Sequence, residues 1–372
     1  MLIEPLLKKI QQSDVNFINQ DKNQYLLPLF DPKTHYLEIA NSKYFKALTI
    51  MRHNIKLASD FYWSTLEDAY NIDLFMFTSS VSSPMGPGSD SEAIDIQFGN
   101  LHTYLVDSSQ FGFEPILMNG IDKVYCYLPS MRGENPDKRH LNQFFHCEAE
   151  IVGSLDILIP KVENYIKFLT KAMLAMENIL SLISLNFVES YRILQSVSKL
   201  EKFPEIEFDK AIQLLKDRDL TYLINQTEHG RDLTSEGEVV LLDILNIRTP
   251  LWIKNYDRDR VAFYQKPHAN NPNKVINADL IFPKILNNSF GGEIAGCGQR
   301  QDNAKEMLES ISRQSLDPTP YSWYINLRNQ KSYATTSGFG LGIERFITWA
   351  LCRDDIKEVI LYPRLKNVIS YP

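Results

Sequence analysis

The stretch VYCYLPSMRGENPDKRHLNQFFHCEAE, residues 124–150, constrains the fold more than any other part of the chain. It reads as a strand, a polar turn and a second strand, which predicts an antiparallel hairpin. Successive side chains of a strand point to opposite faces. On the second strand, one face is expected to be core and carries Phe145, Cys147, Ala149 and Ile151, whereas the opposite face carries Phe144, His146, Glu148 and Glu150.

The second face of this hairpin is charged and also carries an aromatic ring. Arg132 and Glu134 are expected on the same face of the first strand, with Arg139 and His140 near the turn. Charges of both signs are ordinary on a solvated sheet face with cross-strand ion pairs. Phe144 fits that interpretation poorly, because a stacking ring beside a cationic clamp is what a purine–phosphate ligand requires. A solvated face and a nucleotide site both remain open from the hairpin alone.

Two glycine-rich stretches carry further charged residues. In GFGLGIERF, residues 338–346, three glycines run into a helical apolar pattern, and Arg345 lies in the first turn, where a cation is unfavourable. Either an anionic ligand is held there or an exposed arginine follows a glycine turn. In GGEIAGCGQR, residues 291–300, Glu293 suits a divalent cation on phosphate oxygens and Arg300 suits a carboxylate or amide, although a charged surface turn also fits.

The remaining periodicity shows runs of strands interrupted by helices, without regular βαβ alternation. This order predicts an α+β antiparallel sheet rather than a doubly wound fold. A loop rich in Ser, Gly and Pro is expected at 79–91. Helices are predicted at 46–68, at 160–197 (as one or two helices) and at 207–216, and strands within 95–127 and at PLWIKNY, VAFYQ, VINADLIF and SWYINL.

Charge and cysteine content exclude several classes of function. The net charge is −7 and no block of lysine or arginine stands out, so DNA is not an expected partner. The four cysteines lie far apart, which favours a reducing compartment and argues against a structural zinc site. No signal peptide and no membrane-spanning apolar run is evident. We therefore expect a cytoplasmic protein with no membrane association.

Together these motifs resemble the catalytic domain of class II aminoacyl-tRNA synthetases, and the asparaginyl branch is the most similar. Arg132–Gly133–Glu134, Arg139–His140–Leu141 and Phe144 are similar to the second motif of that class, and GFGLGIER is similar to the third. The resemblance continues through FPEIEFDKAIQLL, GRDLTSEGE, ADLIFP, GGEIAGCGQR, TPYSWYINLR and IKEVILYPR, over roughly 46–364. It implies a class II synthetase-like antiparallel sheet flanked by helices, with a helical insert at about 160–220.

The resemblance also implies ligands and residue roles. ATP would be the nucleotide, with Arg132 on its α-phosphate, Phe144 on adenine, and His140 and Arg345 on the outer phosphates. Mg²⁺ would be held by Glu293 together with Asp279. The implied ATP-binding set is Arg132, Glu134, Arg139, His140, Phe144, Glu293 and Arg345, of which Arg132 and Arg345 are catalytic; the implied amino-acid-binding set is Ser91, Glu92, Gln110, Glu114, Glu148 and Arg300.

One position bears on the amino acid. Aspartate-specific relatives place a lysine three residues after the glutamine that Gln110 matches, where this chain has Phe113 followed by Glu114. A glutamate accepts a hydrogen bond from an amide NH₂ and repels a carboxylate. Asparagine is therefore the expected amino acid.

Departures from the family concern the acceptor. Thr335–Thr336 stands where the family has Pro-His before the third motif. Residues 1–45 form only a short extension, whereas the family carries an anticodon-binding β-barrel of about 100 residues ahead of the catalytic domain, here 46–372. We therefore expect an AMP-forming ligase that activates asparagine, or a close analogue, as the acyl-adenylate and transfers it to a non-tRNA acceptor such as an amine. tRNA is a doubtful partner on this interpretation.

Three alternative functions stay open. The chain could be an asparagine synthetase acting on aspartate and ammonia, a minimal asparaginyl-tRNA synthetase, or a non-catalytic regulator that binds an amino acid or nucleotide.

A homodimer is expected through the helix near 46–68. The apolar residues of that helix are Leu48, Met51, Ile55 and Ala58.

Overall fold

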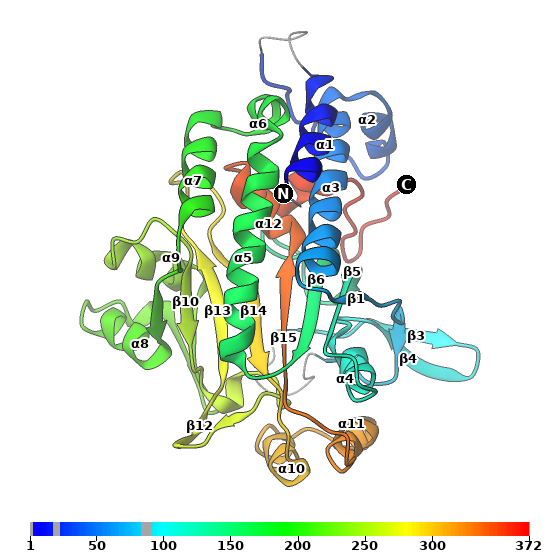
Figure 1. Ribbon diagram of the computed structural model, residues 1–372, viewed down its shortest axis with the longest axis vertical. Helices are drawn as coiled ribbons and strands as arrows, with labels where there is room; N and C mark the ends of the chain where they lie inside the picture. Colours follow the sequence, from blue (N-terminus) through cyan, green and yellow to red (C-terminus); the bar gives the residue numbers. More distant parts are fainter. Residues whose placement is uncertain (1–2, 18–22, 83–90, 372) are drawn as a thin grey trace.

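An eight-stranded sheet forms the centre of the computed structural model, which describes residues 3–17, 23–82 and 91–371 (Figure 1). The two pairings at the edges of this sheet are parallel and the five between them are antiparallel, so the expected α+β antiparallel architecture is confirmed. The strand order is β1 (Tyr70–Asn71), β5 (Lys123–Met131), β6 (Gln143–Val152), β15 (Thr336–Gly342), β14 (Gly292–Gln299), β13 (Asn277–Phe282), β10 (Leu251–Lys254) and β7 (Glu205–Glu207).

Helices cover one face of this sheet, and the main apolar core lies between the two layers (Figure 1). Cys147, Ala149 and Ile151 of β6 are at most 1% exposed in that core, as the strand periodicity predicts. Phe339 and Leu341 of β15 are buried in the same core. The helices of the layer are α1 (Ile3–Val15), α3 (Lys43–Phe61), α5 (Leu155–Leu174), α6 (Glu177–Ile183) and α7 (Phe187–Lys199).

Smaller elements surround the sheet (Figure 1). Three further sheets pair β2 (Phe77–Thr78), β4 (Leu101–Leu105) and β3 (Asp95–Phe98); β8 (Ile224–Thr227) and β9 (Gly230–Leu233); and β11 (Pro267–His268) and β12 (Asn271–Val275). The remaining α-helices are α2 (His35–Asn41), α4 (Phe113–Leu117), α8 (Phe208–Lys216), α9 (Ser235–Ile244), α10 (Ala304–Arg313), α11 (Ser322–Leu327) and α12 (Ile343–Ala350).

Most of the expected elements are present, and four expectations about them were wrong. Residues 160–197 belong to three helices, because the chain breaks near Met176 and again before α7. SWYINL is helix α11, and VAFYQ is irregular. Aromatic content favours strands, but Tyr321, Tyr324 and Ile325 have helical spacing and all pack in one cluster. Finally, β5 ends at Met131, so Arg132 and Glu134 lie in the loop after the strand.

The segment before α3 contains two helices, α1 and α2, in its described part. Leu6 and Ile10 of α1 pack in the main core. The Asp14 carboxylate accepts hydrogen bonds from the N–H groups of Asn178 at 2.9 Å and Ile179 at 2.7 Å, at the start of α6. Burial nevertheless raises the pKa of this carboxyl. The expected loop at 79–91 lies mostly outside the described residues.

The apolar face of α3 is turned into its own chain. Leu48, Met51, Ile55 and Ala58 are fully buried in the main core, so they are not available to a second copy. This finding removes the basis on which the sequence placed a dimer interface at these residues. Among the described residues, no helix is both long and apolar enough to cross a membrane.

Candidate active site

Glycines form the floor of the candidate site. Along β15, Gly338, Gly340 and Gly342 alternate with core residues, and Gly340 and Gly338 pair with Gly296 and Gly298 of β14. A Cβ on Gly338 would lie 2.2 Å from Nη2 of Arg300 and 2.8 Å from a Glu150 carboxylate oxygen. The glycines are therefore needed because charged side chains lie flat across these two strands.

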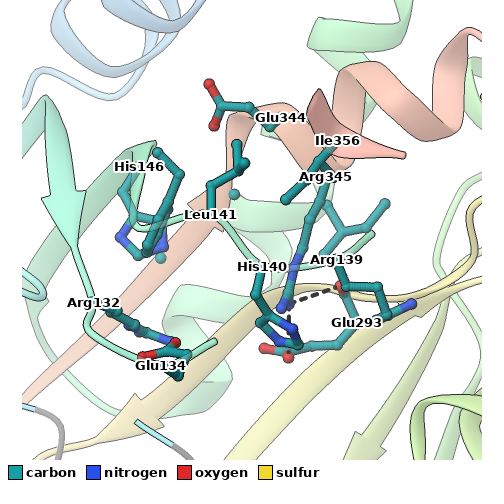
Figure 2. Close-up of a pocket in the computed structure, with 14 residues that line it drawn as sticks. Arg132, Glu134, Arg139, His140, Leu141, His146, Glu293, Glu344, Arg345 and Ile356 are labelled. Carbon is teal, nitrogen blue, oxygen red and sulfur yellow. Dashed lines mark hydrogen bonds and ion pairs between the residues drawn. The ribbon is translucent and has the colours of Figure 1, made fainter. Parts of the chain in front are cut away.

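A first cavity of about 110 Å³ opens above one part of this floor (Figure 2). The hairpin supplies one wall, and β14 and the start of α12 supply the other. The structure brings together in this cavity all seven residues that the sequence assigns to ATP, namely Arg132, Glu134, Arg139, His140, Phe144, Glu293 and Arg345.

Arg132 stands in the first cavity with its guanidinium over Phe144, 5.4 Å from the ring centroid. Its Nε is buried and has no hydrogen-bond partner among the described residues. A buried, unsatisfied donor on a charged group is costly unless a ligand binds it. The pair thus offers an aromatic surface and an unsatisfied cation to the same ligand.

Arg345 enters the first cavity from the first turn of α12, as the sequence predicts. Its Nη1 donates to Glu293 Oε2 at 3.0 Å and to the Glu293 carbonyl at 3.1 Å (Figure 2). In spite of burial, Arg345 and the other nearby arginines lower the pKa of Glu293. Glu344, the residue before Arg345, points away from Arg345 in Figure 2 and pairs with Arg52 at 2.7 Å.

Two more side chains of the first cavity have strong electrostatic surroundings. His140 Nδ1 lies 2.9 Å from Asp137 Oδ1, and burial together with Arg345 lowers its pKa. Arg139 donates to the Gly291 carbonyl, and its Nη2 lies 3.7 Å from the carboxylate of Glu238. The cavity therefore combines three arginines with a neutral histidine, which suits a polyanionic ligand.

The sequence reasoning missed Glu238 of α9. Its carboxylate accepts the backbone N–H of Glu293 at 2.9 Å, and burial raises its pKa to about 7. GRDLTSEGE contributed to the family resemblance, but it carried no local signal for this contact. The contact depends on α9 packing beside β14.

Asp279 and Glu293 lie on neighbouring strands and fit a shared cation. Oxygens of both carboxylates come within 3.5 Å of the position where Gly296 would carry a Cβ. Burial and repulsion from Glu293 raise the pKa of Asp279 well above its usual value. Within the described chain, no three His, Cys, Asp or Glu residues form a metal-binding group. Mg²⁺ is commonly held by one or two carboxylates plus substrate phosphates, which this pair satisfies.

A second cavity of about 240 Å³ adjoins the first and shares Arg132, His146, Glu293 and Gly340 with it. Three of the residues assigned to the amino acid line this second cavity, namely Gln110, Glu148 and Arg300. It also contains residues that the sequence did not assign, which are Ser82, Ser108, His146, Tyr264 and Gln265. His146 was placed on the correct face of its strand, yet no family motif singled it out.

Glu148 and Arg300 give the second cavity opposite charges. Glu148 accepts from Ser108 Oγ at 2.5 Å and from the Ser109 N–H at 2.9 Å, and burial raises its pKa to about 7. Arg300 pairs with buried Glu150 at 2.9 Å and donates to Gln110 Oε1 at 2.5 Å. One end of the cavity thus suits an ammonium group and the other a carbonyl or carboxylate.

Glu114 does not line the second cavity. It is fully buried, pairs with Arg328 at 2.7 Å, and accepts hydrogen bonds from the hydroxyls of Tyr324 and of Tyr333, the latter at 3.0 Å. Its carboxylate is therefore already occupied by protein groups. The prediction that Glu114 contacts the substrate disagrees with this geometry, because α11 supplies the Tyr324 phenol and the residue after it, Arg328, supplies a cation, and local sequence could place neither of them there.

Ser91 and Glu92 also lie outside the second cavity. The carbonyl of Glu92 accepts the Gly133 N–H at 2.6 Å, and its own N–H donates to Glu134 at 3.2 Å. The Glu92 side chain pairs with Lys366 at 2.9 Å on the surface. This segment supports the loop of the first cavity through its backbone.

Comparisons with known proteins show which family this chain resembles. A family model described as tRNA synthetases class II (D, K and N) matches residues 30–366. The asparagine--tRNA ligase of Thermococcus gammatolerans is 30% identical over 76% of this chain and 61% of its own length, and that of Pyrococcus furiosus is 32% identical over 72% and 58%. The chain thus spans about three fifths of these relatives. The Pyrococcus horikoshii asparaginyl-tRNA synthetase complexed with asparaginyl-adenylate aligns with a TM-score of 0.78 at 25% identity, over 91% of this chain and 73% of that one.

Proposed function

Because the chain belongs to the class II tRNA synthetases of the D, K and N group, we propose that it activates an asparagine-like amino acid with ATP and releases pyrophosphate. The observation that carries this proposal is the pair of adjoining cavities that share Arg132, His146 and Glu293. One cavity suits a nucleotide and the other an amino acid, so the reacting groups meet at the shared residues. A P. horikoshii relative solved with asparaginyl-adenylate supports the same assignment.

In the proposed step, a substrate carboxylate oxygen attacks the α-phosphorus of ATP, and the bond to the β-phosphate oxygen breaks. Arg132 binds the α-phosphate and Phe144 stacks on adenine. Arg345 and His140 bind the departing pyrophosphate. The rate gain comes from positioning and from stabilising charge on the phosphate oxygens.

Asp279 and Glu293 are the residues we propose for Mg²⁺. Bound to the phosphates, the ion would neutralise charge on the leaving pyrophosphate. Before ATP binds, Arg345 compensates Glu293. Phosphates that attract the arginine would therefore leave the carboxylate free for a cation.

The side chain of the substrate lies against Arg300 in this proposal. Two sequence arguments counted against aspartate, namely Glu114 and Phe113 in the place of a lysine, and the first is removed because the Glu114 carboxylate is ion-paired with Arg328 away from the cavity. This observation favours a second candidate function, synthesis of asparagine from aspartate and ammonia. Arg300 can bind either a carboxylate or an amide oxygen.

An amine is the acceptor that we propose in place of tRNA. Binding of tRNA requires several cations on one surface, and the sequence has 39 basic against 46 acidic residues with no basic run. A homodimer remains part of the proposal, and its interface must use a surface other than the buried side of α3.

The test is a panel of amino-acid-dependent ATP–pyrophosphate exchange assays, with and without total tRNA. We expect exchange with asparagine or aspartate in the absence of tRNA, with AMP as the nucleotide product. ADP and phosphate as products would refute the proposal. Charging of asparagine tRNA at rates comparable with exchange would replace the amine acceptor by tRNA.

A further inference from the structure

His146 lies where the two cavities meet, and the proposed function does not yet use it. Its ring lines both cavities, and only 15% of the side chain is exposed. On β6 it pairs with Leu128 on one side and with Gly342 on the other. A glycine neighbour leaves room for the imidazole on this face of the sheet. The junction is also where the acyl-adenylate would be made and consumed.

The contacts of His146 fix which nitrogen can meet a ligand. Nδ1 lies 3.0 Å from Ser130 Oγ and 3.5 Å from Glu148 Oε1. The Glu148 carboxylate accepts, and the Ser130 hydroxyl can accept or donate, so a neutral ring with its proton on Nδ1 satisfies both contacts. Among the described residues, Nε2 has no hydrogen-bond partner. That nitrogen then carries a lone pair at the junction.

We propose that His146 is the proton acceptor for an amine that attacks the acyl-adenylate. This inference rests on the proposed function and names its second step. The lone pair of the amine nitrogen attacks the acyl carbon, the bond from that carbon to the phosphate oxygen breaks, and AMP leaves with the electron pair. One proton of the attacking nitrogen passes to Nε2. Glu148, beside the other ring nitrogen, then offers an exit for a proton.

The charges around the His146 ring favour proton transfer in the second step, after the adenylate has formed. Burial and the two arginines Arg132 and Arg345 lower the pKa of His146 well below its usual value, so the ring is neutral before the reaction. The adenylate phosphate bound to Arg132 offsets the charge of that arginine. The imidazole becomes a better base once the adenylate is in place. A base that is neutral at rest and stronger with substrate bound fits proton transfer in the second step.

The experiment separates the two half-reactions in His146→Ala and His146→Gln. Exchange of pyrophosphate reports adenylate formation, and ammonium chloride added to preformed enzyme-bound adenylate reports transfer, measured as amide and AMP. We expect transfer to slow by about a hundredfold or more, well beyond any loss of exchange in the same variant. Imidazole should restore part of the transfer in His146→Ala, where a cavity remains, and not in His146→Gln. His102→Ala, at an exposed histidine of β4, is the matched control.

The possible failures are distinguishable. Equal losses of exchange and transfer, or a transfer rate that does not change, would overturn the role of His146 alone. Wild-type exchange without transfer to ammonia or methylamine would overturn the amine step while leaving the activation step intact. Absence of exchange in the wild type would refute the proposed function itself.

Discussion

The two cavities hold their arginines in opposite ways. In the first cavity, Arg132 has a buried Nε without a partner in the described chain, and Arg345 pairs with a partly exposed Glu293. In the second, Arg300 forms an ion pair with Glu150 in which both side chains are at most 3% exposed. The first arrangement is built to exchange protein partners for a ligand. The second is fixed before any ligand arrives, which suits selection of one side chain rather than tight binding of charge.

The largest expected effect is on stability and comes from the second cavity. Arg300→Met leaves Glu150 buried without its cation, and loss of one partner from a buried pair costs about 3–5 kcal/mol. Urea unfolding would measure it. Arg345→Met is the matched variant, because its partner reaches solvent, and we expect a change below about 1 kcal/mol. Similar losses in both variants would mean that the two pairs do not differ as described.

The next effect is on rate and comes from the first cavity. Arg345→Ala and Arg132→Ala should each lower exchange by about a hundredfold or more, since each removes a group that stabilises transition-state charge. The unfolding curve of Arg345→Ala should stay close to wild type. Exchange that survives both substitutions would contradict the placement of phosphates in this cavity.

The same contrast explains how much the sequence could predict. The residues of the first cavity come from one hairpin and two glycine motifs. Strand periodicity places Phe144 and helix periodicity places Arg345, whereas Arg132 and Glu134 lie in the loop between the strands, where periodicity does not apply. The second cavity joins segments far apart in the chain. Glu114 follows Gln110 by four residues, yet Arg328 and Tyr324, some 200 residues later, decide where its carboxylate points.

The fold, too, could be predicted only in part. The alternation on β6 predicts its core face correctly, because that face packs against a single layer of helices. SWYINL fails, because its aromatic residues satisfy strand propensity, whereas their helical spacing matters only once a cluster around Phe111 and Phe263 exists to receive them. His146 was on the predicted face, but its position between the cavities depends on β15 and on loops that local periodicity cannot place.

A pH-dependent effect belongs to Glu148 in the second cavity. Burial raises the pKa of Glu148 to about 7 in the folded chain, from 4.5 for an ordinary glutamate. The folded state therefore keeps a proton that the unfolded state has lost, and stability falls as pH rises through this window, by at most about 3 kcal/mol. Glu148→Gln cannot titrate. We expect the stability of wild type relative to Glu148→Gln to fall from pH 4.5 to 7 in urea unfolding, and a constant difference would contradict the raised pKa.

A smaller effect separates two glycines of the shared floor. Gly338→Ala places a Cβ against Arg300 and Glu150, and overpacking of this kind costs about 1–3 kcal/mol. For Gly342→Ala, the three atoms nearest to the new Cβ are side-chain carbons of Arg345, at 3.4 Å or more. Amino-acid KM in the exchange assay should rise in the first variant and change little in the second. An equal rise of KM in both variants would contradict our explanation that position 338 must be glycine because Arg300 lies across it.

The smallest effect tests whether Glu92 belongs to the amino-acid site, where the family resemblance puts it and the geometry does not. Its contacts with the loop of the first cavity use backbone atoms, through the Gly133 N–H and the Glu134 carboxylate, and these survive a change of side chain. Glu92→Gln removes only an exposed pair with Lys366, worth at most about 1 kcal/mol. We expect amino-acid KM within about threefold of wild type. Glu148→Gln, measured in the same assay, should raise KM much further, because Glu148 lines the second cavity and Glu92 does not. A comparable rise in both variants would return Glu92 to the amino-acid site and show that its side chain turns inward when substrate binds.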